Sequence, residues 1–138
     1  MRVLAIDHVA IAVKNLDEAI ETFKKILGAG PVKVEEVPEE KVRVAMFRVG
    51  ESYIELLEGT SPDSAVTKFI EKRGEGIHHI ALRVVSVDEE ARRLGSEGFR
   101  LVYPEPRTVA TGDRKIEFIH PKSVHGVLLE LVERLGEE

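Results

Sequence analysis

The sequence predicts an α+β fold built from two modules that share one order of elements: a strand, a helix and three further strands. Two internal similarities lead to this prediction. Residues 6–13 and 77–84 are similar strand-like segments that lie 71 residues apart. Residues 53–58 and 128–133 form a second similar pair, which lies 75 residues apart. Such a repeat indicates that one supersecondary unit occurs twice in the chain.

A helix is expected after the first strand of each module. Over residues 15–28 the apolar side chains recur at the spacing of one helix face, and Asn15 and Glu18 have the spacing of a capping box. Residues 86–98 repeat this plan and end near a glycine. Each module then closes with a hairpin, formed by residues 42–49 with 52–58 and by residues 115–120 with 126–133.

The length of 138 residues argues for one domain that contains both modules. A linking helix is expected between them, begun by Ser61 and Pro62 and ended by Gly74. We therefore predict a single domain over residues 1–138, with module one at about 4–59, the linking helix at about 61–74 and module two at about 76–134.

The composition excludes several classes of function. Acidic residues outnumber basic ones by 25 to 20, and the net charge of −5 is dispersed, so no nucleic-acid surface is expected. The chain has no cysteine, which leaves histidine and carboxylate side chains as its strong metal ligands. No segment has the apolar run of a signal peptide or a membrane span, and we therefore expect a cytoplasmic protein that does not bind membranes.

Strand alternation places four ionisable residues on one side of the predicted sheet. In the first strand Val9, Ile11 and Val13 form the apolar face that the following helix needs, so the histidine before them points the other way. The same alternation applies to the repeated strand at residues 77–84 and to the glutamate-containing strands at residues 53–58 and 128–133. The residues that share the face opposite the helices are therefore His8, Glu55, His79 and Glu130.

Two imidazoles and two carboxylates at repeat-equivalent positions indicate a divalent metal site. These donors suit a borderline cation, and the remaining coordination positions could take water or a substrate oxygen. A lone histidine on a strand is more often structural. However, Glu55 and Glu130 each lie between apolar neighbours, where an unpaired carboxylate is costly to bury. The metal site is therefore the better interpretation of the four residues together.

Five segments carry a recognisable pattern, namely residues 7–13, 54–58, 76–84, 118–123 and 126–131. They resemble the methylmalonyl-CoA epimerase family, which belongs to the vicinal oxygen chelate, or glyoxalase-like, superfamily. The resemblance covers nearly the whole chain. It implies that two βαβββ modules pair into a cupped mixed sheet around a divalent metal ion.

The resemblance implies metal ligands at His8, Glu55, His79 and Glu130, the same residues that strand alternation selects. It implies an isomerase that interconverts (2R)- and (2S)-methylmalonyl-CoA by metal-assisted removal of the C2 proton through an enolate, with Glu130 as the catalytic base. It further implies a homodimer that acts on an acyl-CoA thioester. Co²⁺ is the expected metal ion, with Mn²⁺, Ni²⁺, Zn²⁺ or Mg²⁺ as alternatives.

The chain differs from some family members at the position of the second proton-transferring residue. Certain members carry a carboxylate at the position of Val44, which cannot transfer a proton. Glu55, Glu117 or a metal-bound water remain for this role, although Glu117 is more simply a residue of the strand surface. Some epimerases also have Gln in place of Glu55, so the charge of the site varies within the family.

The other polar residues of these motifs have simpler interpretations. His78 is expected on the helix-facing side of its strand, either as a residue that supports a metal ligand or as a packing residue. His120, Lys122 and Ser123 belong to a predicted turn, where they could approach the substrate or its coenzyme A phosphates, or be exposed turn residues.

Three other functions use related folds. A glyoxalase I-type lyase or isomerase and a ring-cleaving dioxygenase would use a similar metal site, whereas a non-catalytic small-molecule-binding protein typically lacks the metal. The fold alone does not distinguish them. The complete set of four ligands argues against the pure binding protein.

Overall fold

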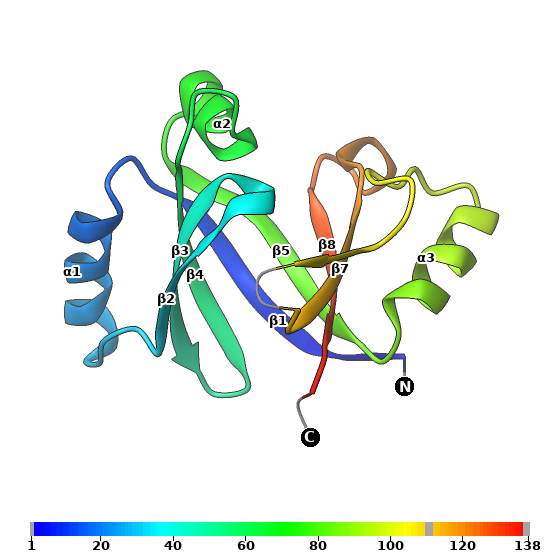
Figure 1. Cartoon of the computed structure of the whole chain (residues 1–138), viewed down its shortest axis with the longest axis horizontal. Coiled ribbons are helices and arrows are strands. Elements are labelled where there is room, and N and C mark those ends of the chain that lie inside the picture. The colour runs from blue at the N-terminus through cyan, green and yellow to red at the C-terminus, as the bar shows by residue number, and fades with distance from the viewer. Residues whose placement is uncertain (1, 110–111, 137–138) are drawn as a thin grey trace. The chain divides into compact units, whose positions relative to one another are not determined.

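The computed structural model describes residues 2–109 and 112–136. The chain divides into two compact units. One unit spans His8–His78, and the other combines the N-terminal segment up to Asp7 with the residues from His79 onward. Each unit has a mixed β-sheet with a helix on one face, so the predicted α+β class is confirmed for both (Figure 1).

The unit of residues 8–78 contains the second half of the first strand and the three strands after it. Its elements are β1 (Val3–Ala12), α1 (Leu16–Leu27), β2 (Lys33–Val37), a 3₁₀ turn (Pro38–Glu40), β3 (Val42–Val49), β4 (Ser52–Gly59) and α2 (Ala65–Arg73). The strand order is β2-β3-β4-β1, in which β1 and β4 are parallel and the other neighbours antiparallel. The predicted order of the first module is thus confirmed.

The other unit repeats this plan. Its elements are most of β5 (Gly76–Val84), then α3 (Val87–Ser96), β6 (Arg107–Val109), β7 (Arg114–Ile119), a 3₁₀ turn (Pro121–Ser123) and β8 (Leu129–Arg134). The strand order is β5-β8-β7-β6, and again only the pair that includes the first strand, β5 with β8, is parallel. The start of the chain belongs here, because the Val85 N–H donates to the Arg2 carbonyl at 3.0 Å.

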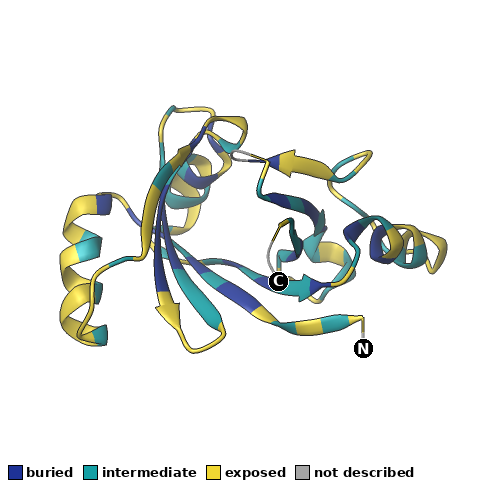
Figure 2. Ribbon diagram, turned by 60° about the horizontal axis from the view of Figure 1, so that its bottom comes forward, coloured by how far each residue is buried: buried dark blue, intermediate teal, exposed yellow. Residues whose placement is uncertain are grey.

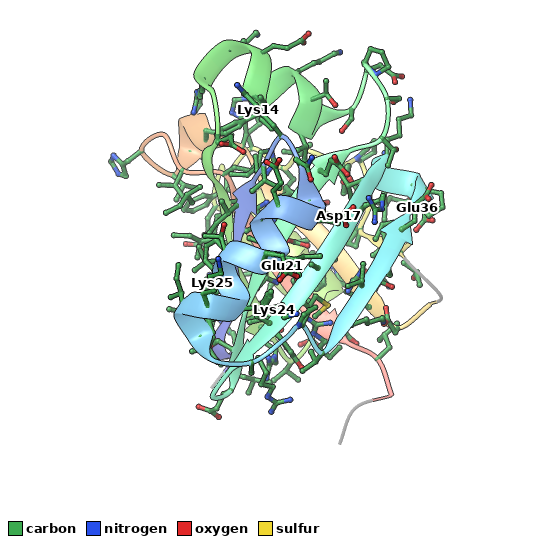
Figure 3. All side chains as sticks on the ribbon, turned by 90° about the vertical axis from the view of Figure 1, so that its left-hand side faces the viewer. Lys14, Asp17, Glu21, Lys24, Lys25 and Glu36 are labelled. Carbon is green, nitrogen blue, oxygen red and sulfur yellow. The ribbon has the colours of Figure 1, made fainter. Side chains whose placement is uncertain are left out.

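Helix α1 begins and ends where the sequence predicts. The Asn15 side chain accepts a hydrogen bond from the Glu18 N–H at 3.0 Å, and Gly28 ends the helix in the left-handed conformation at φ 75°. Its polar side carries an ion pair between Glu21 and Lys24 (Figure 3). Its apolar side packs on the sheet in a cluster of Ile11, Val13, Leu16, Ala19, Ile20, Phe23, Leu27, Ala45, Phe47, Ile54 and Leu56.

Helix α3 has the equivalent place in its own unit. The Ser86 hydroxyl caps it by accepting the Glu89 N–H at 3.2 Å. The helix packs on its sheet in a second cluster, formed by Val3, Leu82, Val84, Val87, Leu94, Phe99, Leu101, Ile119, Val124, Leu129 and Leu131. Each unit thus has a helix-and-sheet core of its own.

Helix α2 starts at Ala65 and not at Ser61, which corrects the prediction for the linking helix. The capping hydroxyl is that of Ser64, which accepts the Val66 N–H at 3.2 Å. Two serines precede the helix, and residue spacing alone does not tell which of them caps it. The helix ends at Gly74 as predicted.

Helices α1, α2 and α3 lie at the surface of their units. Figure 2 shows their outer sides exposed, whereas the buried residues concentrate on the strands. Helix α1, the longest of these three, has 12 residues. No helix within residues 2–109 and 112–136 is both long and apolar enough to cross a membrane.

Candidate functional site

One buried histidine–glutamate pair lies in the unit of residues 8–78. His8 on β1 and Glu55 on β4 are 3.3 Å apart between Nδ1 and Oε2. The parallel pairing of the two strands places Glu55 opposite Ala10, two residues after the histidine. His8 is 3% and Glu55 is 6% exposed, so the pair is almost removed from water.

An equivalent pair lies in the other unit. His79 on β5 and Glu130 on β8 are 2.8 Å apart between Nε2 and Oε1. Glu130 lies opposite Ala81, which again follows the histidine by two residues. Both members of the pair are buried. The two units therefore form the same pair from the same strand register, as the sequence repeat predicts.

Both pairs lie on the sheet face that points away from the helix of their unit. Ile11 and Leu56 pack against α1, and Leu82 and Leu131 pack against α3. Because successive residues of a strand point to opposite faces, the histidines and glutamates occupy the other side. The faces predicted from strand alternation are thus confirmed within each unit.

The donor atoms of the pairs fit a divalent metal ion. Each pair offers an imidazole nitrogen and a carboxylate oxygen, which are ligands that Zn²⁺ and Co²⁺ accept. All four side chains are buried, and buried ionisable groups need a partner or a metal ion.

His78 packs against helix α2 of its own unit. Its ring contacts Phe69 of α2 edge-on, with the ring centroids 5.0 Å apart and 72° between the ring planes. This contact agrees with the packing role, which is one of the two roles expected for His78.

The predicted polar turn after β7 is present. The His120 Nδ1 atom accepts the Lys122 N–H at 3.0 Å, and the Arg100 N–H donates to the Ser123 hydroxyl at 2.9 Å. Partial burial, together with the charges of Arg100 and Lys122, lowers the pKa of His120. The imidazole of His120 is therefore neutral near pH 7 and available as a hydrogen-bonding group.

The sequence patterns did not single out two aromatic residues near the pair of His79 and Glu130, of which one contacts His79 and the other contacts the first. The Phe118 ring lies edge-on to the His79 ring, with centroids 5.4 Å apart, and the Tyr103 ring lies edge-on to Phe118 at 5.8 Å. Phe118 pairs with Glu130 across β7 and β8, so strand alternation could have found it. Tyr103 comes from the segment between α3 and β6, and no periodic pattern points to it.

Glu117 is fully buried and lies on the α3 side of β7, which corrects both expectations for it. It is 0% exposed and pairs with Leu131, a residue of the α3 core. It is therefore not a surface residue, and it does not share the face of the histidine–glutamate pair. Its Oε2 atom accepts the N–H groups of Tyr103 and Phe118, both at 2.9 Å. Burial raises the pKa of Glu117, and these two hydrogen bonds offset part of the rise.

A second buried ionic group joins three strands of the same unit. The Asp7 carboxylate is 0% exposed and accepts hydrogen bonds from Arg83 Nε at 2.8 Å and from Arg134 Nε and Nη2 at 3.1 and 2.7 Å. Hydrogen bonds between charged groups are stronger than those between neutral groups. This group therefore holds the first residues of β1 against β5 and β8.

The family model of the glyoxalase/bleomycin resistance protein/dioxygenase superfamily matches residues 7–124. The chain therefore belongs to this superfamily. The matched range includes His8, Glu55 and His79, three of the four residues of the buried pairs.

Within the superfamily, the chain is similar to methylmalonyl-CoA epimerases. It is 35% identical to the mitochondrial enzyme of Dictyostelium discoideum, over 94% of this chain and 78% of that protein. A Streptomyces coelicolor methylmalonyl-CoA epimerase variant, solved in complex with 2-nitronate-propionyl-CoA, is 41% identical with a TM-score of 0.93, covering 99% of this chain and 98% of that chain. An uncharacterised Bacillus subtilis protein is 38% identical, over 96% of this chain and 94% of that protein. These similarities confirm both the predicted glyoxalase-like fold and the predicted resemblance to the methylmalonyl-CoA epimerase family.

Proposed function

We propose that the chain is a methylmalonyl-CoA epimerase, an isomerase that interconverts the (2R) and (2S) forms of its substrate. The observation that carries this proposal is the duplicated, buried histidine–glutamate pair on the face opposite each helix. The similarity to epimerases over nearly the full length supports it, because one of them is solved with a CoA thioester. The substrate would accordingly be an acyl-CoA thioester.

The residues proposed to hold a divalent metal ion are His8, Glu55, His79 and Glu130. When bound, the ion would act as a Lewis acid for negative charge on the substrate oxygens. We propose Co²⁺, with Mn²⁺, Ni²⁺, Zn²⁺ or Mg²⁺ as alternatives. Imidazole nitrogen suits Co²⁺, Ni²⁺ and Zn²⁺, whereas carboxylate oxygen also accepts Mn²⁺ and Mg²⁺.

Glu130 is the proposed base. Its carboxylate would take the proton from C2 of the thioester, and the electron pair of the broken C–H bond would move into the thioester carbonyl to give an enolate. A proton delivered to the other face of the planar C2 then forms the C–H bond of the opposite epimer. Because Glu130 is buried beside His79, bulk water does not compete for the proton that it holds.

The proton donor for the opposite face is proposed to be Glu55 or a water molecule. Val44 is a buried apolar residue opposite Leu57 and has no proton to give. Glu117 lies on the α3 side of its strand. Glu55, in contrast, is a buried carboxylate on the face that carries the first pair.

Binding of the coenzyme and assembly are further parts of the proposal. The exposed Lys122 ammonium would pair with a phosphate of coenzyme A, with Ser123 beside it in the same turn. A homodimer and a cytoplasmic location are proposed with the function. Gel filtration and cell fractionation would test these two points directly.

The test of the function is an assay of the purified chain with (2R)- and (2S)-methylmalonyl-CoA in deuterated water. We expect interconversion of the two forms, with solvent deuterium incorporated at C2, and loss of the activity after chelation. A parallel assay with the hemithioacetal of glutathione and methylglyoxal provides the control. Turnover of the hemithioacetal without epimerisation would establish the glyoxalase reaction and overturn the proposal, as would inactivity of the metal-loaded chain on both epimers.

A further inference from the structure

The Glu117 carboxylate fills a gap in the backbone hydrogen bonding along the edge of β7. Residues 100–103 run beside this edge, where the His120 N–H donates to the Arg100 carbonyl and the Val102 N–H donates to the Phe118 carbonyl, both at 2.8 Å. The next two N–H groups in line both donate to the side chain of Glu117. The carboxylate thus takes the place of a strand carbonyl.

Glu117 holds the backbones of Phe118, whose ring contacts His79, and of Tyr103, whose ring contacts Phe118. Tyr103 lies edge-on to Phe118, with 83° between the ring planes, and Phe118 lies edge-on to His79 at 88°. The Arg107 guanidinium covers the Tyr103 ring, 3.7 Å from its centroid, and so limits its movement. A continuous series of contacts therefore links the buried carboxylate to the imidazole.

We infer that Glu117 is a positioning residue for His79, because its carboxylate fixes the backbones of Tyr103 and Phe118 and their rings fix the orientation of the imidazole. The orientation of the imidazole depends only on residues of the unit that contains His79. The expected effect of this orientation on metal binding rests on the proposed function. Residues that orient a metal-binding histidine commonly change metal affinity by about 10- to 100-fold when they are replaced.

The structure defines which substitution preserves this role and which removes it. Both N–H groups donate to the same oxygen, Oε2, and the other oxygen has no partner among the described residues. In Glu117→Gln the amide oxygen can therefore accept both hydrogen bonds. In Glu117→Leu a side chain of similar size offers no acceptor, and both N–H groups lose their partner. Ile119→Val is the matched control, because it trims a neighbouring α3-core residue and leaves Glu117 in place.

The decisive measurement is the NMR spectrum of the His79 imidazole in the metal-free chain. The chain has five histidines, and the signals that disappear in His79→Gln assign this one. We expect Glu117→Leu to shift the ring-proton signals, because the Phe118 ring next to the imidazole changes its position. Glu117→Gln and Ile119→Val should leave the signals near their wild-type values. Unchanged signals in Glu117→Leu, or equal shifts in all three variants, would overturn the inference.

Two further experiments complete the test. If Glu117→Leu does not fold, Tyr103→Leu can replace it, because this variant interrupts the same series of contacts and keeps Glu117. We expect Tyr103→Leu to shift the His79 signals. Unshifted His79 signals in Tyr103→Leu would overturn the inference. Titration with Co²⁺ should then show that whichever variant shifts the His79 signals binds the ion about 10-fold more weakly than the wild type. The Co²⁺ affinity of Glu117→Gln should be close to that of the wild type. A wild-type chain that binds no metal contradicts the proposed function and leaves the NMR result on His79 intact.

Discussion

The Oε1 atom of Glu130 lies 2.8 Å from Nε2 of His79 in a pair that is more than nine-tenths buried. The pair can form because Ala81, which Glu130 faces across the two parallel strands, has only a methyl group. Ala10 has the same position opposite Glu55. A small residue two positions after each histidine thus leaves space for the glutamate.

Glu130→Gln is expected to lose epimerisation by more than the roughly 10²- to 10⁴-fold that is typical for a missing general base. The loss is larger because the amide removes both the proton acceptor and a charged metal ligand. Turnover should be measured with the metal content determined in parallel. Glu133→Gln is the matched control, because Glu133 is on the same strand but binds the Val87 N–H on the α3 side. Near-normal turnover of metal-loaded Glu130→Gln would show that Glu130 is not the base.

His79→Ala and His78→Ala should differ sharply, although the two residues are adjacent. His79 pairs with Glu130, whereas His78 packs on Phe69. We expect His79→Ala to lose the bound metal and the turnover, and His78→Ala to keep its metal with a modest loss of stability. Metal analysis after gel filtration, together with thermal unfolding, measures both effects. Metal retained by His79→Ala would contradict the assignment of the ligand.

Removal of the metal ion should lower the melting temperature. Each buried pair contains a carboxylate, and an ion that binds only the folded state adds stability by mass action, about 2.7 kcal/mol at a free concentration 100 times Kd. Calorimetry before and after chelation, with metal content verified, would measure the shift. His79→Ala should show no such shift. An unchanged transition in the wild-type chain would argue against a metal site made of these residues.

The free energy of unfolding of Glu117→Gln should increase relative to that of the wild type as the pH rises. Burial raises the pKa of Glu117 above its ordinary value of 4.5, so between 4.5 and the raised pKa the folded chain holds a proton that the unfolded chain has lost. Stability therefore falls with rising pH across this window, and the loss is constant above it. Gln does not titrate. Urea unfolding of both proteins from about pH 4 to about pH 8 gives the difference in unfolding free energy, and a constant difference would contradict the prediction.

Gly59→Ala should destabilise the unit of residues 8–78 by about 1–3 kcal/mol, because the added methyl group overpacks the contact between β4 and α2. A Cβ atom at Gly59 would lie 2.0 Å from the Thr67 hydroxyl and 3.0 Å from the Thr67 backbone nitrogen. Gly30→Ala is the matched control, since its nearest neighbour would be the end of the Lys24 side chain at 4.0 Å. Equal unfolding free energies for the two variants would show that α2 adjusts its position freely.

Much of the fold and of the two pairs was predictable from local patterns. The capping sequence at Asn15 and the glycine at position 28 mark the ends of α1, because both act through hydrogen bonds within one helix turn. Strand alternation assigned each histidine and glutamate to a face, because successive side chains of a strand point to opposite sides. The joining of the four residues into one metal site remains a prediction.

Only the tertiary structure decided the environment of Glu117 and Asp7. The sequence shows Glu117 as a polar residue in a strand, but residues 100–103 cover the edge of that strand and bury it. Asp7 meets Arg83 and Arg134, which lie 76 and 127 residues away along the chain. The periodicity of the sequence predicts on which face of a strand or helix a side chain lies, because this face depends only on the local backbone conformation. Burial and partners depend on which distant segments pack there, and this is set by the summed free energy of long-range contacts.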